Sequence, residues 1–364
     1  MQIAVTCGFG VETATKYELK RLGYADARCE NGRFGFDGNL SDAFRLNMFL
    51  RTADRVYINL KSFFADTFDN LFDGVYALDW AEYIKGDNAI DITAKCKNSK
   101  LFAYSAVQSI VKKAIVKKLS NKYKTLSETG AHIHIEVVIE NDTANILLDT
   151  SGDGLHKRGY RDMVYEAPIR ETLAAALLFY SEWTPDKPLF DAFCGSGTIP
   201  IEAALKAQNI APGLLRRFAY EDMPFTDKEE VKRIRREAED MVDKDVRLKI
   251  TGFDIERRAI VLCNRHAANA GVKDVIHFET NDMRNFSSAV SGGYIVSNPP
   301  YGERLMNVTN LRTLMIDFKK KFKELDSWHA CIITAYADFE RYFGRAAKTR
   351  KTFNASIACR IYNY

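Results

Sequence analysis

The feature that most restricts the fold is an alternation of short apolar strands with helices, which begins near residue 165. Strands joined by helices rather than by tight turns run parallel, because the connecting helix carries the chain back across the sheet. The sequence therefore predicts a mostly parallel, doubly wound α/β sheet with helices on both faces. The expected strands are 189–193, 249–254, 275–279, 294–297 and 330–334, and the expected helices are 199–208, 311–325 and one that ends at 270.

A glycine-rich loop follows the first of these strands, where residues 191–198 read Asp-Ala-Phe-Cys-Gly-Ser-Gly-Thr. Gly195 and Gly197 allow a tight turn and a close approach of the backbone to a ligand at the carboxyl end of a strand. The spacing differs from the dinucleotide motif Gly-x-Gly-x-x-Gly, and no Lys-Ser or Lys-Thr follows as in a phosphate loop. The loop instead indicates a cofactor that carries an amino acid, whose ammonium group Asp191 would receive.

Two further carboxylates follow later strands. Asp254 can accept hydrogen bonds from both hydroxyls of a ribose, and Asp282 can accept one from the amino group of adenine. A lone aspartate in such a place is commonly a helix cap, which is the simpler interpretation of Asp282 by itself. Acids after three successive strands favour S-adenosylmethionine as the ligand. Cys194 is not interpreted as a nucleophile, because no histidine lies near it in the sequence.

The fourth strand is followed by a second motif, Asn298-Pro299-Pro300-Tyr301. Consecutive prolines fix φ and remove two backbone donors, which leaves a rigid loop that presents acceptors. The amide oxygen of Asn298 and the carbonyl of Pro299 can each accept one hydrogen of an exocyclic amine. Tyr301 can stack on the base, which contributes ~1–3 kcal/mol. A plain turn explains Asn-Pro alone, but the whole motif behind the glycine loop predicts methyl transfer to a planar amine.

Cysteine usage and hydrophobic patterning argue against several classes of protein. The seven cysteines are an odd number and include no Cys-x-x-Cys pair, so neither a disulfide framework nor a zinc site is expected. No apolar run approaches the ~18 residues of a membrane helix, and the N-terminus lacks a signal-peptide pattern. We expect a cytoplasmic protein without metal or membrane contact.

Basic residues are concentrated in three parts of the chain, although the net charge of +4 is modest. Residues 92–127 hold nine lysines and no acid, and residues 341–364 hold six basic residues and no acid. A solvated helix face explains lysines of this kind in many proteins, but the local excess favours a phosphate backbone as partner. The residues expected to contact RNA are Lys112, Lys113, Lys117, Lys118, His156, Lys157, Arg158 and Arg161.

The first 150 residues predict two small α+β units, with strands at 3–6, 33–36, 89–94, 132–137 and 144–149 and a helix at 102–119. An insertion at residues 209–247 interrupts the alternation of the second half. Within it, Thr226-Asp227-Lys228-Glu229 has the spacing of a capping box. This spacing predicts a solvent-facing helix within the charged run to residue 245.

With these motifs in place, the chain resembles the class I methyltransferases that carry an RNA-binding THUMP domain, and among them the bacterial 23S rRNA guanine-N2 methyltransferases. Residues 154–161, Gly-Leu-His-Lys-Arg-Gly-Tyr-Arg, match a junction motif of that family, and residues 167–174 continue it. The resemblance implies a ferredoxin-like segment at 1–43, a THUMP domain at 44–154 and a Rossmann-like methyltransferase domain at 155–364. It also implies a single modification, since no second methyltransferase domain follows.

The resemblance assigns roles to individual residues. Those implied for S-adenosylmethionine are Thr172, Asp191, Phe193, Cys194, Gly195, Gly197, Thr198, Asp254, Ile255 and Asp282, and those implied for the target base are Asn298, Pro299, Pro300 and Tyr301. The family loop usually begins Asp-Pro-Phe, whereas Ala192 follows Asp191 here, which costs some rigidity and keeps both glycines.

Several alternatives stay open on the sequence alone. The same chemistry could act on tRNA, and the same amine clamp would serve adenine N6. A non-catalytic RNA-binding assembly factor with an inactive cofactor fold is the alternative from another class, and the intact clamp argues against it. The sequence leaves the oligomeric state open between monomer and homodimer.

Overall fold

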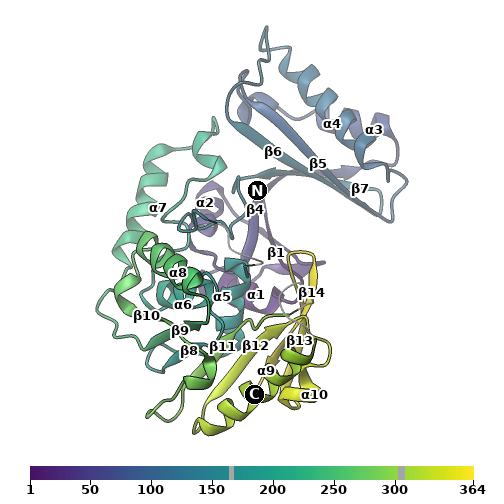
Figure 1. Ribbon diagram of the computed structural model, residues 1–364. Coiled ribbons are helices and arrows are strands. Elements are labelled where there is room, and N and C mark those ends of the chain that lie inside the picture. Colours follow the sequence, from purple (N-terminus) through teal and green to yellow (C-terminus); the bar gives the residue numbers. More distant parts are fainter. Residues whose placement is uncertain (164–167, 302–307) are drawn as a thin grey trace.

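The computed structural model describes residues 1–163, 168–301 and 308–364 (Figure 1). Its N-terminal part is one seven-stranded sheet in the order β2-β3-β1-β4-β7-β6-β5. The twelve-residue strand β4 joins the two halves, because it pairs with β1 on one side and with β7 on the other. The strands are β1 (Gln2–Cys7), β2 (Arg28–Glu30), β3 (Arg33–Asp37), β4 (Ala53–Phe64), β5 (Ala89–Lys97), β6 (His132–Glu140) and β7 (Thr143–Asp149).

Helices cover this sheet at both ends. They are α1 (Glu12–Arg21), α2 (Leu40–Phe49), α3 (Phe68–Tyr76), the short η1 (Trp80–Glu82) and α4 (Tyr104–Leu119). The end of the sheet that carries α3 and α4 extends away from the C-terminal half (Figure 1). The expected division between residues 43 and 44 falls inside α2, whose Phe44 and Leu46 share one core with residues of both halves, so the structure has no break there.

The C-terminal part is a second seven-stranded sheet in the order β10-β9-β8-β11-β12-β14-β13. The five strands from β10 to β12 in this order are parallel, as the sequence predicts, and β14 and β13 are antiparallel. The strands are β8 (Leu189–Asp191), β9 (Ile250–Asp254), β10 (Ile276–Thr280), β11 (Tyr294–Ser297), β12 (His329–Thr334), β13 (Lys348–Asn354) and β14 (Ile357–Asn363). The hairpin of β13 and β14 was not expected from the sequence.

Alternating side chains of the second sheet enter two different cores. Leu189 and Val296 pack in one core with helices α5, α6 and α8, whereas Phe190 and Ile295 pack in the other with α9 and α10. Both faces of the sheet are therefore covered, which confirms the expected α/β class. The helices are α5 (Glu171–Tyr180), α6 (Thr198–Ala207), α8 (Arg257–Asn269), α9 (Val308–Glu324) and α10 (Phe339–Phe343), with short turns η3 (Lys273–Val275) and η4 (Met283–Asn285).

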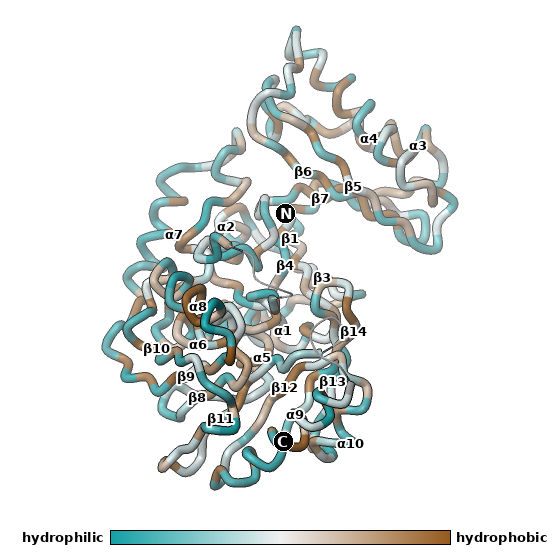
Figure 2. The backbone as a smooth tube through the Cα atoms, in the orientation of Figure 1, coloured by the Kyte–Doolittle hydropathy of each residue, from teal (hydrophilic) through white to brown (hydrophobic). Residues whose placement is uncertain are grey.

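The insertion at 209–247, which belongs to the C-terminal half of the chain, packs against the first sheet. It holds η2 (Ala219–Asp222) and α7 (Lys228–Asp240), a helix of largely hydrophilic sequence (Figure 2). The expected helix is present and most of its polar side chains are exposed, but its cap and its buried face differ from the prediction. Asp227 rather than Thr226 caps α7, and Ile234 is buried in the core of the first sheet. Arg45 of α2 also forms an ion pair of 2.7 Å with Glu237 of α7.

The helices in the described part of the chain include none that is long and apolar enough to cross a bilayer.

Candidate active site

The candidate site lies where the strand order of the second sheet reverses. On one side of β8 the sheet continues with β9 and β10, and on the other side it continues with β11 and β12. Ligands of doubly wound sheets bind outside the carboxyl ends of the strands at this reversal. Asp191 is the last residue of β8 and Asn298 directly follows β11, the adjacent parallel strand. The two sequence motifs therefore meet at one edge of the sheet.

The glycine loop needs its glycines for conformation and for space. Gly195 and Gly197 have φ values of 52° and 82°, in the left-handed region that residues with a Cβ rarely adopt. A Cβ on Gly197 would lie 3.2 Å from the Cys263 Sγ. A Cβ on Gly195 would meet nothing within 4 Å, so the loop leaves open space on that side. This open space beside bare backbone fits a bound ligand.

Asp191 is buried at the base of the loop. The Ser297 hydroxyl donates to its Oδ1 over 2.7 Å, and the Phe193 amide donates to the same atom over 3.2 Å. Burial raises the pKa of Asp191 to about 7, and its hydrogen bonds with Ser297 and Phe193 oppose the shift. Its Oδ2 has no hydrogen bond within the parts of the chain that are described, which leaves it for a cationic ligand group.

Asp254 ties the end of β9 to the glycine loop. Its Oδ2 accepts the Gly195 amide over 3.0 Å and its Oδ1 accepts the Glu256 amide over 2.9 Å. Burial raises the pKa of Asp254. The neighbouring Ile255 is 65% exposed, and its assignment to the cofactor stays a prediction.

Asp282 takes the role of a cap in this structure. Its carboxylate accepts the Arg284 amide over 2.9 Å at the start of η4 and forms an ion pair of 3.3 Å with the Arg284 guanidinium. Arg284 also pairs with Asp317 over 3.0 Å. An adenine amine would have to share the carboxylate with these partners, so the assignment of Asp282 to the cofactor stays a prediction.

The other residues predicted for the cofactor pack around the loop. The Cys194 Sγ lies 3.8 Å from the Cys263 Sγ, and burial raises the pKa of Cys194, which agrees with a thiol that is no nucleophile. Thr198 begins α6 and accepts a hydrogen bond from Arg161, and Thr172 is buried at the start of α5. Phe193 packs edge-on against Phe318 in the core beneath the loop, with ring centroids 5.2 Å apart.

The amine clamp holds an unpartnered acceptor. The Asn298 Oδ1 is buried and has no hydrogen-bond partner among the residues that the structure describes. A buried amide oxygen without a donor costs about 1–3 kcal/mol. A substrate amine would remove this cost, because it brings the missing donor. Pro299 is buried and Pro300 half-buried beside it. Glu303 and Arg304, which follow the motif, lie outside the described residues, as does Ala167 of the junction motif.

Tyr301 is held by the hairpin that the sequence did not predict. The Asn354 Nδ2 of β13 lies 3.3 Å from the Tyr301 hydroxyl, and the Cys359 Sγ of β14 lies 4.0 Å from it. Burial raises the pKa of Tyr301 to about 12, so the hydroxyl is neutral at pH 7. Sequence reasoning missed Asn354 and Ser297. A serine inside a buried strand is a weak signal for Ser297, and the sequence holds none for Asn354.

The structure corrects the basic cluster at the junction. Arg158 is buried in an ion pair with Glu202, with Nε and Oε1 3.4 Å apart, and cannot contact RNA. Arg161 pairs with Glu171 over 3.5 Å and is largely buried. Burial lowers the pKa of His156 to about 4, so its ring is neutral at pH 7. Lys157 is exposed and pairs with Asp153 over 2.7 Å.

The lysine-rich stretch is also partly compensated. Carboxylates from other segments pair with four of its nine lysines, in the pairs Lys95–Glu136, Lys97–Glu140, Lys100–Asp66 and Lys112–Glu128. Lys117 lies over the rings of Phe72 and Tyr76, and Lys118 lies over that of Tyr76. Lys113 is exposed on the same helix. The remaining positive field is therefore weaker than the sequence suggests.

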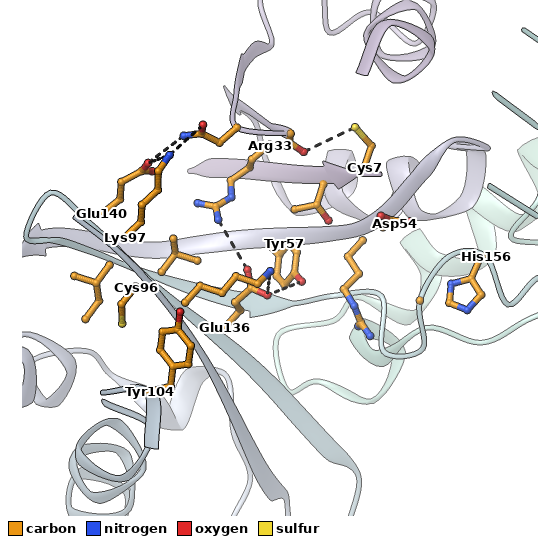
Figure 3. A pocket seen from close by; sticks show the side chains of 18 of the residues that line it. Cys7, Arg33, Asp54, Tyr57, Cys96, Lys97, Tyr104, Glu136, Glu140 and His156 are labelled. Atoms are coloured by element: carbon orange, nitrogen blue, oxygen red, sulfur yellow. Dashed lines mark hydrogen bonds and ion pairs between the residues drawn. The ribbon is translucent and has the colours of Figure 1, made fainter. Parts of the chain in front are cut away.

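A cavity of about 580 Å³ lies on the open face of the first sheet (Figure 3). Its charged lining includes Arg33, Arg55, Lys95, Lys97 and Arg170, against Asp54, Glu136 and Glu140. Five cations face three acids, so the lining is basic overall and suits a phosphate-bearing ligand. No group of three or more metal-binding side chains comes together among residues 1–163, 168–301 and 308–364.

Family profiles divide the chain into three parts. An RlmL ferredoxin-like domain matches residues 2–57, a THUMP domain matches 65–149, and an RMKL-like methyltransferase domain matches 158–363. The order of the three parts is the one that the family resemblance implies.

Individual relatives cover the chain to different extents. A Bacillus subtilis protein named "Putative RNA methyltransferase YpsC" is 41% identical over 367 residues, 100% of this chain and 95% of that protein. The ribosomal RNA large subunit methyltransferase K/L of Shewanella baltica is 31% identical over 360 residues, 96% of this chain. The match covers 51% of that relative, so the present chain spans about half its length.

Solved structures agree over the full length. The crystal structure of SMU.472 complexed with SAH is 40% identical, with a TM-score of 0.91 over 100% of this chain and 97% of that one. A Listeria monocytogenes protein described as a "predicted N6-adenine-specific DNA methylase" is 42% identical, with a TM-score of 0.93 over 100% of this chain and 95% of that one.

Proposed function

Because this chain belongs to the family of RMKL-like methyltransferases, we propose that it methylates the exocyclic N2 amine of a guanosine in 23S ribosomal RNA. S-adenosylmethionine is the cofactor, in agreement with the related structure complexed with SAH. The ribosomal substrate is supported by the K/L relatives and by the THUMP domain at residues 65–149. The basic cavity of the first sheet adds a surface on which RNA can dock.

One observation carries the proposed chemistry, the unpartnered Oδ1 of Asn298. This acceptor follows β11, next to the strand that ends in Asp191. An amine brought to this point would donate one hydrogen to Asn298 and one to the Pro299 carbonyl. The nitrogen lone pair would then point away from both acceptors. Positioning of reacting atoms is the main contribution required here, and it is worth ~7–11 kcal/mol.

The residues of the glycine loop fit S-adenosylmethionine. The free Oδ2 of Asp191 would receive the ammonium group of S-adenosylmethionine. The loop at Gly195 leaves room for the methionine part of the cofactor. Bound there, S-adenosylmethionine supplies a methyl group on a sulfonium, which is already an activated leaving group. The clamp residues hold the amine and stack the base, and the proton released after transfer passes to water.

A second target atom is favoured by one comparison. The Listeria relative is described as a "predicted N6-adenine-specific DNA methylase", and a clamp of two acceptors binds any exocyclic amine. Transfer to tRNA and a non-catalytic role in ribosome assembly are the remaining alternatives.

The test uses unmodified 23S rRNA and tRNA transcripts with isotopically labelled S-adenosylmethionine, followed by digestion and identification of the labelled nucleoside by mass. We expect N2-methylguanosine from the rRNA. Labelled N6-methyladenosine would overturn the base assignment, and label only in tRNA would overturn the substrate. Cofactor binding without label in either RNA would support the non-catalytic role.

A matched pair of variants ties the activity to the clamp. Asn298→Ala is expected to lower kcat about 100-fold, because small misplacements of reacting atoms have effects of this size. Asn363→Ala is the control, since Asn363 is an asparagine of the same sheet whose Oδ1 is likewise buried and unpartnered among the described residues. It should leave kcat within about twofold.

A further inference from the structure

Two exposed phenylalanines from opposite ends of the chain lie in contact. Phe9, between β1 and α1, is 58% exposed, and Phe353 of β13 is 49% exposed. Their ring centroids are 5.9 Å apart with an interplanar angle of 67°, an edge-to-face pair. Contiguous exposed apolar surface marks binding sites more often than single exposed residues do. We call these two side chains the Phe9–Phe353 pair.

Backbone contacts fix this pair in place. The Thr352 hydroxyl donates to the Phe9 carbonyl over 2.8 Å. Gly10, at φ 83°, brings its backbone so close to β13 that a Cβ there would lie 2.1 Å from the Lys351 carbonyl oxygen. The N-terminal sheet and the catalytic domain therefore present the two rings jointly, and neither ring sits on a freely moving loop.

The pair lies at the same end of the sheet as the amine clamp. Thr334, at the carboxyl end of β12, pairs with Arg360, so the turn between β13 and β14 projects beyond the carboxyl ends of the parallel strands. Asn354, the residue after Phe353, contacts the Tyr301 hydroxyl over 3.3 Å. Phe353 and Asn354 are consecutive in β13, so the exposed ring and the side chain that holds the clamp tyrosine lie on opposite faces of the same end of the hairpin.

Positive charge accompanies the rings. Lys351 and Arg360 are cross-strand partners, and Lys351 lies two residues from Phe353, so these three side chains point to one face of the hairpin. Lys351 is exposed and Arg360 half-exposed. Residues 341–364 contain no acidic residue. Aromatic rings beside cations are the surface that unpaired nucleotides bind, by stacking of the base and attraction of the phosphate.

We propose that the Phe9–Phe353 pair stacks on an unpaired nucleotide next to the target base, with Lys351 and Arg360 on its phosphate. The proposal rests on the proposed RNA substrate. It adds that the RNA is single-stranded around the target base. Holding the neighbouring nucleotide offsets part of the cost of extruding the target base. It also gives the N-terminal domain a direct share in placing the substrate.

The test measures binding of a labelled nine-nucleotide single-stranded RNA with a central guanosine, and of the corresponding duplex, to the full chain with S-adenosylhomocysteine present. Phe9→Ala and Phe353→Ala are each expected to weaken binding of the single strand about tenfold, as loss of one stacked base does. Phe353→Trp should retain binding within about twofold. Duplex binding should change little in all three variants.

Tyr17→Ala is the matched control, because Tyr17 of α1 also pairs an exposed aromatic ring with one of the catalytic domain, Phe179 at 5.1 Å. Calorimetric binding of S-adenosylhomocysteine verifies the fold of each variant. The proposal is overturned if Phe9→Ala and Phe353→Ala bind the single strand like the wild type, or if Tyr17→Ala loses as much. It is also overturned if the wild type binds the duplex alone. Failure of methyl transfer in the transcript assay would count against the proposed function. It would not change the result of this binding experiment, which tests the Phe9–Phe353 pair alone.

Discussion

The Ser297 hydroxyl, at the end of β11, donates to the Asp191 Oδ1, at the end of β8, over 2.7 Å. It also accepts the Ala192 amide over 2.7 Å. One serine thus joins the strand that precedes the cofactor loop to the strand that precedes the amine clamp. Within the described residues, the Asp191 Oδ2 accepts no hydrogen bond. The ionisation of this carboxyl decides whether it can hold a cation.

Cofactor affinity is expected to depend on pH through Asp191. Its pKa is about 7 because of burial, so the carboxylate that attracts an ammonium group is lost as the pH falls through 7. The affinity for S-adenosylhomocysteine should fall about tenfold from pH 8 to pH 6. Calorimetric titration across this range tests the effect. Asp191→Asn should bind weakly at every pH, whereas Asp186→Asn, an exposed control, should keep the wild-type slope.

The same carboxyl should destabilise the cofactor-free protein. A raised pKa means that the folded state disfavours the charged form, so stability is lost as pH rises from about 4 to about 7 and stays low above. Asp191→Asn should therefore be more stable than the wild type by a few kcal/mol at pH 8, and by less at pH 5. Urea unfolding at both pH values measures this, and an equal gain at both would contradict it.

How far the sequence predicts this site depends on the range of the interactions. The parallel strands and both motifs are local patterns, because a strand buried on both faces is apolar throughout and a tight turn needs glycine. The sequence alone therefore identifies Asp191 and Asn298 as site residues. Only the topology of the sheet shows that the two residues meet where the strand order reverses.

The errors concern contacts between distant segments. The sequence predicts Arg158 as a surface cation, because its partner Glu202 lies 44 residues away and nothing local marks the pair. The partners of Lys95 and Lys97 come from β6, which pairs with β5 in parallel. The sequence predicts only a basic segment where the hairpin of β13 and β14 lies, although Thr352 and Asn354 are buried.

Asn354 is expected to position Tyr301 through its amide. Asn354→Ala should lower kcat/KM for RNA about tenfold and leave the affinity for S-adenosylhomocysteine unchanged, because the tyrosine ring loses one support. On a Tyr301→Phe background the same substitution should have little further effect, since the hydroxyl it contacts is gone. Additive losses in this double-mutant cycle would refute the link. Asn363→Ala on β14 serves as the control.

Arg158 is expected to act on stability rather than on RNA. Arg158→Met leaves Glu202 charged and buried without its partner, which costs about 3–5 kcal/mol. The Tm should fall by several degrees, while RNA affinity measured below the transition stays that of the wild type. Lys157→Met, next to it on the surface, breaks an exposed pair and should change the stability by less than about 1 kcal/mol. An RNA defect in folded Arg158→Met would restore the surface interpretation.

The lysines of α4 that have no carboxylate partner among the described residues should carry the salt dependence of RNA binding. Lys113, Lys117 and Lys118 lie on one helix, and Lys112 beside them is neutralised by Glu128 over 2.8 Å. Each unpaired lysine that meets a phosphate adds about 0.7–0.9 to the slope of log affinity against log salt. Replacing the three by alanine should therefore flatten the slope by about 2, whereas Lys112→Ala changes it less. Lys232→Ala on α7, an exposed lysine paired with Glu229, is the control. An unchanged slope in the triple variant would mean that the RNA binds another face of the protein. The basic cavity beside β5 and β6 would then be the remaining surface that suits a phosphate backbone.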